Sequence, residues 1–292
     1  MNVALYCRNI KPQDIPVLQE ILDQLAAKKI GVYIYKPFFE QVWPEIKTRS
    51  GISTFVSHED IRDKIEYLFT LGGDGTLLDT INFVRDYPIL VMGINIGRLG
   101  FLADIGKEEI GHAIHAITKG SYVTDQRTLL ELESSEPLFD DVNYALNDVT
   151  IHKKDTSAMI TIHAYINGEL LNSYWADGLI IATPTGSTGY SLSCGGPIIM
   201  PTSENFVITP IAPHNLNVRP IVVSDSSVIS FEIEGRYEQF YCTLDSRTRP
   251  IDNLTQLAVK KCQHKISLVR LPDHHFLETL RTKLMWGAHA RK

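Results

Sequence analysis

The sequence contains few cysteines, and they are scattered at Cys7, Cys194, Cys242 and Cys262. No two of them form the C-x-x-C pair that zinc sites and redox-active dithiols use. This spacing excludes a cysteine-based metal cluster and a disulfide framework. We therefore expect reduced thiols, as in a cytoplasmic protein.

Long apolar runs are also missing. No uninterrupted stretch approaches the roughly 18 residues that a membrane-spanning helix needs. The first residues, MNVALYCRNIKPQD, lack the basic and long apolar segments of a secretory signal peptide. We expect a protein of the cytoplasm that has no membrane partner.

Positive charge is not in excess. The chain has 28 Lys and Arg residues against 34 Asp and Glu residues, which gives a net charge of −6 at pH 7. Such a chain has no general attraction for nucleic acid or anionic lipid, so we expect no nucleic-acid partner. Binding of a polyanion would require a specific local site rather than the overall charge.

The sequence does contain enough apolar residues for a packed core. Of its 292 residues, 44% are hydrophobic, which excludes a disordered or collagen-like chain. This length is typical of one large domain or two ordinary ones.

The first part of the chain alternates between two hydrophobic periods. Short apolar runs predict strands at 1–7, 30–36, 65–71 and 87–95, and helical spacing predicts helices at 16–29, 77–87 and 107–119. Alternation of strands and helices is typical of a parallel sheet with flanking helices. We therefore predict an α/β domain over residues 1–122.

Residues 123–269 have a different character, with short β-branched segments separated by turn dipeptides. Asn167-Gly168 between two such segments predicts a hairpin, because both central residues of a type I′ turn need positive φ. This part is predicted to be a β-rich domain. Residues 270–292 regain helical spacing through Leu277, Leu280 and Leu284, and we expect this C-terminal helix to return to the first domain.

The sequence Gly72-Gly73-Asp74-Gly75-Thr76 follows a predicted strand directly and precedes a predicted helix. Glycines allow positive φ and let the backbone approach a ligand, and the first N–H groups of a helix suit phosphate oxygens. Asp74 would then be placed to accept a proton from an attacking hydroxyl. The structural alternative is a glycine-rich turn in which Asp74 is the N-cap of the helix.

Other phosphate motifs are missing. The sequence has no G-x-x-x-x-G-K-[ST], and the nearest match to G-x-G-x-x-G has Leu78 in place of its third glycine. These absences disfavour a P-loop enzyme and an ordinary Rossmann dehydrogenase.

A second polar segment runs from Asp177 to Pro197 with the sequence DGLIIATPTGSTGYSLSCGGP. Its hydroxyls and free N–H groups suit phosphate or the edges of a base, and Tyr190 suits stacking on a ring. The alternative is a structural one, in which the Ser and Thr residues cap the start of a helix and Gly195-Gly196-Pro197 ends it. The presence of GGDGT favours the binding function.

Taken together, these motifs resemble those of the NAD kinase family. GGDGT, Asn147-Asp148, DGLIIATPTGSTGYSLSCGGP and TPIAPHNLNVRP match its order and gaps over roughly residues 68–250. GGDGT also occurs in phosphofructokinases and in diacylglycerol and sphingosine kinases, so the resemblance implies a diacylglycerol-kinase/phosphofructokinase-like superfamily. The long second motif is specific to NAD kinases. The implied reaction is ATP-dependent phosphorylation of the adenosine ribose 2′-hydroxyl of NAD, which gives NADP.

The resemblance implies a role for each matching residue. Asp74 would be the base that takes the 2′-hydroxyl proton and would also contact NAD with Gly75. The backbone of Gly72, Gly73, Gly75 and Thr76 would lie against the ATP phosphates, where a Cβ at position 75 would crowd them. A divalent cation, Mg²⁺ by expectation, would arrive with ATP, and no protein-bound metal site is expected.

Asn147 and Asp148 would contact the adenosine part of NAD, with Asp148 where Glu is commoner in the family. The structural alternative for the pair is an exposed turn. Asp177 would lie at the nicotinamide end, near Trp175, which replaces an Arg found in many members. Further NAD-binding residues implied by the resemblance are Thr188, Gly189, Tyr190, Ser191, Leu192, Ser193 and Arg247.

For some polar residues we predict no contact with a ligand. For His214 and Arg219, which lie in the matching segment TPIAPHNLNVRP, a structural role is the alternative. Asp273-His274-His275 is expected to form a solvated loop.

We expect the active site in a cleft between the two domains, since each supplies one motif. The expected partners are NAD and ATP, or polyphosphate in place of ATP, and a second copy of the chain in a dimer or tetramer. Two alternatives to NAD kinase stay open, namely a lipid kinase that shares GGDGT and a dinucleotide-binding regulator without turnover.

Overall fold

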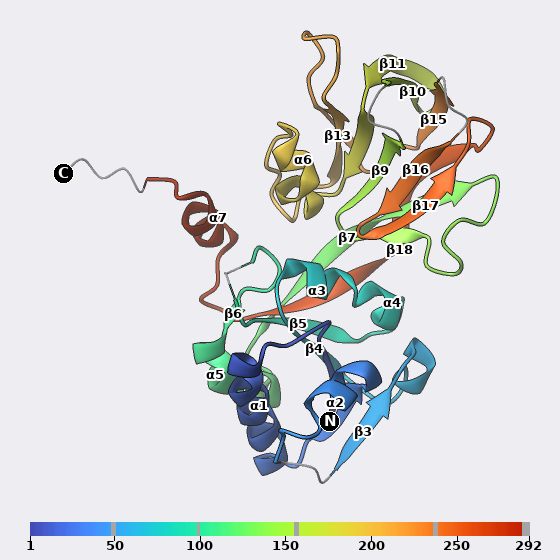
Figure 1. The fold of residues 1–292 in the computed structure, drawn as a ribbon. Helices are drawn as coiled ribbons and strands as arrows, with labels where there is room; N and C mark the ends of the chain where they lie inside the picture. Colours follow the sequence, from blue (N-terminus) through green and yellow to red (C-terminus); the bar gives the residue numbers. More distant parts are fainter. Residues whose placement is uncertain (48–50, 98–99, 155–157, 236–238, 288–292) are drawn as a thin grey trace. The chain divides into compact units, whose positions relative to one another are not determined.

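The computed structural model describes residues 1–47, 51–97, 100–154, 158–235 and 239–287. The chain divides into two compact units. Unit 1 comprises Met1–Gln126 and Ile266–Lys292, and unit 2 comprises Arg127–Lys265. The strands β7 (Val123–Ser134) and β18 (Leu257–Arg270) carry the chain from one unit to the other (Figure 1).

Unit 1 contains a parallel sheet in the order β3-β2-β1-β4-β5. Its strands are β1 (Asn2–Tyr6), β2 (Gly31–Tyr35), β3 (Ile52–Phe55), β4 (Tyr67–Leu71) and β5 (Leu90–Asn95). The short β6 (Ile105–Gly106) and the C-terminal end of β18 also pair with β5 in parallel.

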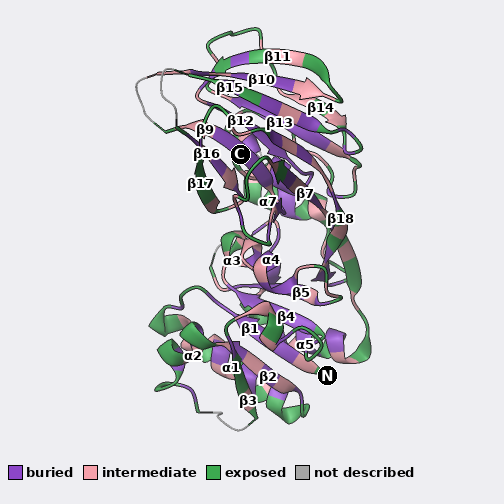
Figure 2. Cartoon of the chain, turned by 90° about the vertical axis from the view of Figure 1, so that its right-hand side faces the viewer, coloured by how far each residue is buried: buried purple, intermediate pink, exposed green. Residues whose placement is uncertain are grey.

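Unit 1 also contains α-helices and 3₁₀ helices. They are η1 (Pro12–Asp14), α1 (Ile15–Ala27), α2 (Lys36–Val42), η2 (His58–Asp60), α3 (Asp74–Leu78), α4 (Ile81–Val84), η3 (Lys107–Glu109), α5 (Ile110–Lys119) and α7 (Phe276–Leu284). α1 buries Leu18, Ile21, Leu22 and Leu25 on one face and shares a hydrophobic core with α5 and the strands. Figure 2 shows the strands β1, β4 and β5 as largely buried.

Unit 2 is built from two antiparallel sheets. One contains the order β11-β10-β15-β18, with β7 beside β18 and β8 beside β7, and the other has the order β14-β13-β12-β9-β16-β17. The bounds are β8 (Tyr144–Ala145), β9 (Asp148–Lys153), β10 (Ile160–Ile166), β11 (Glu169–Ala176), β12 (Gly178–Ala182), β13 (Asn205–Ile211), β14 (Ile221–Ser224), β15 (Ile229–Glu234), β16 (Phe240–Leu244) and β17 (Arg247–Ile251). The short helices η4 (Gly186–Thr188) and α6 (Tyr190–Ser193) follow β12.

The alternation of side chains along β9 decides which residues can meet a ligand. Val149 and Ile151 belong to the core of unit 2, to which both sheets contribute. Successive side chains of a strand point to opposite faces, so Asp148 and Thr150 project from the other face of the sheet. Asp148 pairs with Ala182, the last residue of β12, directly before the polar turn. The pairing of β9 with β12 thus places Asp148 beside the start of the polar turn in the second motif.

The structure confirms the predicted succession of an α/β part and a β-rich part. It also confirms the hairpin at Asn167-Gly168, whose φ values are 51° and 84°. Ile166 and Glu169 pair on either side of this turn. α2, β3, β13 and β17 were not predicted from the sequence.

The helix predicted at 77–87 is wrong in extent. It begins at Asp74 and is divided into α3 and α4. The hydroxyl of Thr80 donates to the carbonyl of Leu77 at 2.7 Å, which offers that carbonyl a local partner and favours a break. No helix among the described residues combines the length and apolar character needed to cross a membrane.

Candidate functional site

The GGDGT segment connects β4 to α3 in unit 1. Gly72 has a φ of +155°, and a Cβ there would lie 2.4 Å from Oγ1 of Thr76, so the turn requires glycine at this position. Gly73 is the N-cap of α3, and Asp74 is the first residue of the helix. The alternative with Asp74 as N-cap is therefore wrong.

The Asp74 carboxylate is held by a neighbouring loop. Its Oδ2 accepts a hydrogen bond from the N–H of Phe101 at 2.8 Å, and its Oδ1 accepts from Leu102 and Ala103 at 3.0 Å each. An ionised carboxylate has about four acceptor sites. Among the described residues no fourth donor contacts this group, so one acceptor site on Oδ2 stays open.

Gly75 does not have a backbone conformation that requires glycine. It is an exposed residue of α3 and does not have positive φ. A Cβ at this position would meet Nη1 of Arg8 at 3.8 Å, which is ordinary contact. The protein itself therefore leaves room for a side chain at position 75.

Arg8 is a charged residue beside GGDGT that the sequence did not suggest. Its guanidinium binds the Asp79 carboxylate through Nε and Nη2, and Tyr6 donates to the same carboxylate at 2.9 Å. These bonds orient a half-exposed cation beside Gly75. Because Arg8 is far from GGDGT in the sequence, no local pattern could have revealed it.

In unit 2 the structure brings Asn147 together with the second motif. The carbonyl of Asn147 accepts from the N–H of Thr183 at 2.9 Å. A Cβ on Gly186 would lie 2.0 Å from that carbonyl oxygen, and one on Gly189 would lie 3.3 Å from Nδ2 of Asn147. The two glycines therefore allow the turn to pack directly on Asn147.

The side-chain carbonyl of Asn147 is buried, and Oδ1 has no hydrogen-bond partner among the described residues. A buried acceptor without a partner costs about 1–3 kcal/mol of folding free energy. A ligand that supplies the missing donor would remove this cost in the bound state. This atom supports a binding site at the turn.

Asp148 is 6% exposed, so the alternative of an exposed turn is wrong for this residue. Burial, together with the nearby carboxylate of Asp245, raises its pKa to about 7. The hydroxyl of Thr150 donates to its Oδ1 at 3.0 Å, which acts in the opposite direction. The site thus holds a carboxyl group that titrates near neutral pH.

The predicted residues of the turn after β12 have different environments. Ser191 is buried and its hydroxyl bonds that of Thr209 at 2.8 Å, whereas Tyr190 is 48% exposed. Thr188 donates its hydroxyl to the carbonyl of Thr185 at 3.1 Å. The partly exposed or exposed members are Thr188, Gly189, Tyr190, Leu192 and Ser193.

Asp177 forms an ion pair with Lys153 at 2.6 Å. Nearby in the sequence, Trp175 packs against His214 with ring centroids 4.2 Å apart, and the His214 N–H donates to the Trp175 carbonyl at 2.9 Å. Arg219 donates to backbone carbonyls of its own loop. His214 and Arg219 thus both have internal contacts.

Arg247 lies in β17, and its guanidinium donates to the carbonyls of Val142, at 2.6 Å, and Tyr144. It also lies over the ring of Phe139, with 5.9 Å from its central carbon to the ring centroid. The predicted NAD contact of Arg247 stays a prediction.

The expectation of a solvated loop at 273–275 is wrong for His274. Its Nε2 bonds Oε1 of Glu109 at 2.9 Å, and its Nδ1 lies 3.6 Å from the Asp104 carboxylate. Hydrogen bonding to these carboxylates raises the pKa of His274 to about 9. His274 therefore attaches the segment before α7 to the rest of unit 1.

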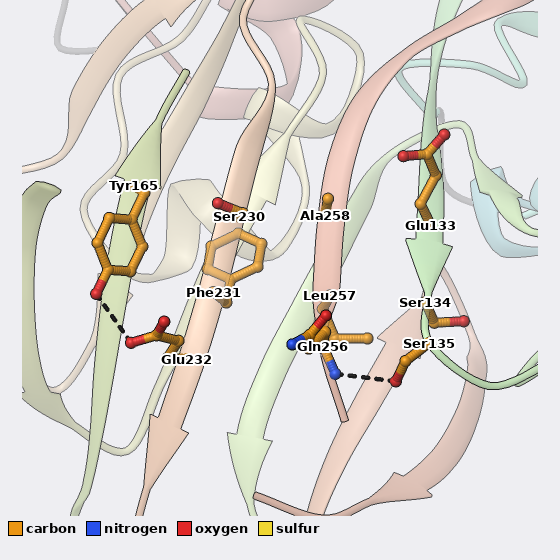
Figure 3. Close-up of a pocket in the computed structure, with 10 residues that line it drawn as sticks. All are labelled: Glu133, Ser134, Ser135, Tyr165, Ser230, Phe231, Glu232, Gln256, Leu257 and Ala258. Carbon is orange, nitrogen blue, oxygen red and sulfur yellow. Dashed lines mark hydrogen bonds between the residues drawn. The ribbon is translucent and has the colours of Figure 1, made fainter. Parts of the chain in front are cut away.

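Two cavities lie away from the residues predicted to bind NAD and ATP. One of about 390 Å³ in unit 2 is lined by Glu133, Ser134, Ser135, Tyr165, Ser230, Phe231, Glu232, Gln256, Leu257 and Ala258 (Figure 3). Another of about 330 Å³ in unit 1 surrounds His274. No predicted site residue is among the described residues that line either one.

Comparisons with known proteins cover nearly the whole chain. The family model of the ATP-NAD kinase N-terminal domain matches residues 3–122, and that of the ATP-NAD kinase C-terminal domain matches residues 146–271. A NAD kinase of Cytophaga hutchinsonii is 49% identical over 292 residues, which is 100% of both chains.

Solved structures share the fold. A yeast NADH kinase complexed with NADH superposes with a TM-score of 0.88 at 24% identity, over 99% of this chain and 88% of that one. A NAD kinase from Archaeoglobus fulgidus in complex with ATP gives 0.74 at 22% identity, over 98% of this chain and 99% of that one.

Proposed function

The chain belongs to the NAD kinase family, and from that premise we propose which of its residues carry out the reaction. The activity is ATP-dependent phosphorylation of NAD at the 2′-hydroxyl of its adenosine ribose, which gives NADP. The observation that carries the assignment of the chemistry is the Asp74 carboxylate, held by three backbone N–H groups with one acceptor site left on Oδ2.

Asp74 acts as the general base. A sugar hydroxyl is almost fully protonated at neutral pH, so a carboxylate that takes its proton during attack contributes about 10²–10⁴-fold to the rate. Oδ2 is the atom that accepts this proton, because both sites of Oδ1 are occupied by Leu102 and Ala103. The loop thereby fixes the direction from which the ribose hydroxyl approaches.

The phosphates of ATP lie against the backbone of Gly72, Gly73, Gly75 and Thr76. Arg8, oriented by Asp79 beside Gly75, adds positive charge at this place. Transfer of a phosphoryl group depends on alignment and on neutralisation of negative charge. A kinase that uses ATP needs a divalent cation, and Mg²⁺ bound to the ATP phosphates is the ion we propose.

NAD binds unit 2 through its adenosine part. The Asn147 amide offers an acceptor that is buried and without a partner among the described residues, and Asp148 offers a carboxylate for the ribose hydroxyls. Tyr190 provides an exposed ring for stacking, with Thr188, Gly189, Leu192 and Ser193 around it. Asp177 lies at the nicotinamide end, where Lys153 balances its charge.

Two further expectations are kept as proposals. The strand–GGDGT–helix arrangement supports membership in the superfamily of diacylglycerol kinases and phosphofructokinases. A homo-oligomer is supported by the edge strand β11, which carries the exposed side chains of Leu170 and Trp175.

The test is NADP formation by the purified chain from NAD and ATP, with and without added Mg²⁺. We expect NADP only when ATP and a divalent cation are both present, and no phosphorylated lipid when diacylglycerol is offered as the acceptor. Polyphosphate in place of ATP tests the donor. Binding of NAD without release of ADP would contradict the assignment and favour a dinucleotide-binding regulator.

A further inference from the structure

Asp245 lies at the turn between β16 and β17 and has a left-handed backbone conformation, with φ of 53°. Such a conformation is uncommon for a non-glycine residue and is tolerated best by Asn and Asp. The residue is partly buried, and desolvation of its carboxylate raises its pKa although hydrogen bonds act in the opposite direction. This acidic group has no place in the reaction described above.

The Asp245 carboxylate binds three successive backbone N–H groups of the segment that begins β9. Its Oδ2 accepts from Leu146 at 2.9 Å, and its Oδ1 accepts from Asn147 at 2.7 Å and from Asp148 at 3.2 Å. The backbone N–H of Asp245 returns a bond to the carbonyl of Asp148 at 3.0 Å. Four hydrogen bonds thus connect one turn to residues 146–148, and three of them are made by the two residues assigned to adenosine.

These bonds hold residues 146–148 from one side, and the turn after β12 holds Asn147 from the other. The Asn147 carbonyl is already bound by Thr183, and Gly186 and Gly189 pack against the same residue. Hydrogen bonds to an ionised acceptor are about twice as strong as neutral ones. The carboxylate therefore determines where the Asn147 and Asp148 side chains point.

We propose that Asp245 is a positioning residue for the dinucleotide, holding the backbone of residues 146–148 so that Asn147 and Asp148 meet the adenosine. The proposal rests on the proposed function of those two residues. Asp245 itself needs no contact with NAD. A merely structural role would instead affect the whole molecule, including its affinity for ATP.

The experiment compares four variants of the full chain with the wild type. Asp245→Gly removes the carboxylate and keeps the positive φ at no steric cost. Asp245→Asn keeps one acceptor oxygen and replaces the other with an NH₂ group, which cannot accept from a backbone N–H. Asp252→Asn is the matched control, because Asp252 also binds backbone N–H groups, those of Leu254 and Thr255, in an exposed turn. Asp148→Ala reports on the adenosine site itself.

The measurements are the Kd for NAD by titration, the KM for ATP, and the melting temperature. We expect both Asp245 variants to weaken NAD binding by about tenfold or more, with the KM for ATP within about twofold of wild type. Asp252→Asn is expected to leave NAD affinity unchanged. Asp245→Asn decides the question if Asp245→Gly does not fold.

Wild-type NAD affinity in the Asp245 variants, with Asp148→Ala impaired, overturns the positioning role alone. Equal losses of NAD and ATP affinity also overturn it, because they indicate a general structural role. Wild-type affinity in Asp148→Ala places the adenosine elsewhere and overturns the proposed function of this segment together with the present proposal.

Discussion

Gly100 lies so close to Asp74 that a Cβ on Gly100 would come within 1.8 Å of the Asp74 Oδ1. Any side chain at position 100 must therefore displace the carboxylate or the loop that holds it. We expect Gly100→Ala to lower kcat by at least about tenfold, since a displaced base no longer meets the ribose hydroxyl. Steady-state kinetics with NAD and ATP is the measurement.

Gly97→Ala in the same loop is the control for this prediction. A Cβ on Gly97 would have Oδ1 of Asn95 as its nearest neighbour at 3.9 Å, so it is expected to be tolerated. Equal activities of the two variants would contradict the idea that Gly100 leaves room for the base.

Asp74→Asn tests the base directly. The amide preserves the shape of the side chain but cannot take a proton, so we expect kcat to fall by about 10²–10⁴-fold. Its NH₂ group also takes the place of a carboxylate oxygen that accepts from the N–H groups of residues 101–103. Because that hydrogen bond is lost, a small decrease in melting temperature is expected. The NAD affinity should change little. Wild-type kcat would remove Asp74 from the chemistry.

The sequence indicated those parts of the fold and of the site that depend on local chemistry. Asn167-Gly168 predicted its hairpin because the turn needs positive φ at both residues, and both have it. Positions in the GGDGT and TPTGSTGY motifs could be named because the motif residues are consecutive in the chain.

Contacts between distant residues could not be predicted in this way. Asp245 binds Leu146 across 99 positions, and Arg8 binds Asp79 across 71. No periodicity or turn signal connects residues so far apart. The left-handed Asp245 and the oriented Arg8 therefore become visible only in the folded chain.

Asp148→Asn is predicted to have opposite effects on stability and function. The pKa of Asp148 is raised from 3.8 to about 7, so its ionisation costs folding free energy that grows as pH rises from about 4 to 7 and is complete above 7. The amide removes this cost and keeps the oxygen that Thr150 contacts. We expect the variant to melt a few degrees above wild type at pH 8 and near it at pH 4.

The same variant should bind NAD more weakly at pH 8, because the ribose hydroxyls lose a charged acceptor. Wild-type affinity should decrease below about pH 7 as Asp148 gains its proton, whereas that of Asp148→Asn should not. The other groups that act on Asp148 or are affected by it are Thr150, Tyr190, Cys194 and Asp245. A melting difference independent of pH would contradict this account.

Gly75→Ala separates the ligand role of Gly75 from a structural one. The residue is helical and has room for a Cβ, so alanine should stabilise α3 by about 0.5–1 kcal/mol. If the ATP phosphates approach this backbone, the KM for ATP should nevertheless rise several-fold. Gly111→Ala in α5 is the control, since its Cβ would also make ordinary contacts. Unchanged KM values in both variants would place the phosphates away from Gly75.

Arg8 is predicted to stabilise the negative charge of the ATP phosphates. We expect Arg8→Gln to raise the KM for ATP by about tenfold and to lower kcat, with the KM for NAD changed by less than about twofold. Arg8→Lys keeps the charge but not the two-pronged bond to Asp79, so an intermediate effect is expected. Arg62→Gln, which removes an exposed arginine paired with Asp63, is the control and should leave both KM values unchanged.

Loss of Arg8 also leaves the Asp79 carboxylate without its guanidinium, which alone lowers stability. The double variant Arg8→Gln/Asp79→Asn removes both charges and should recover much of the melting temperature. Its KM for ATP should stay high if Arg8 acts on the phosphates. Recovery of ATP affinity along with stability would show that Arg8 serves only to hold Asp79.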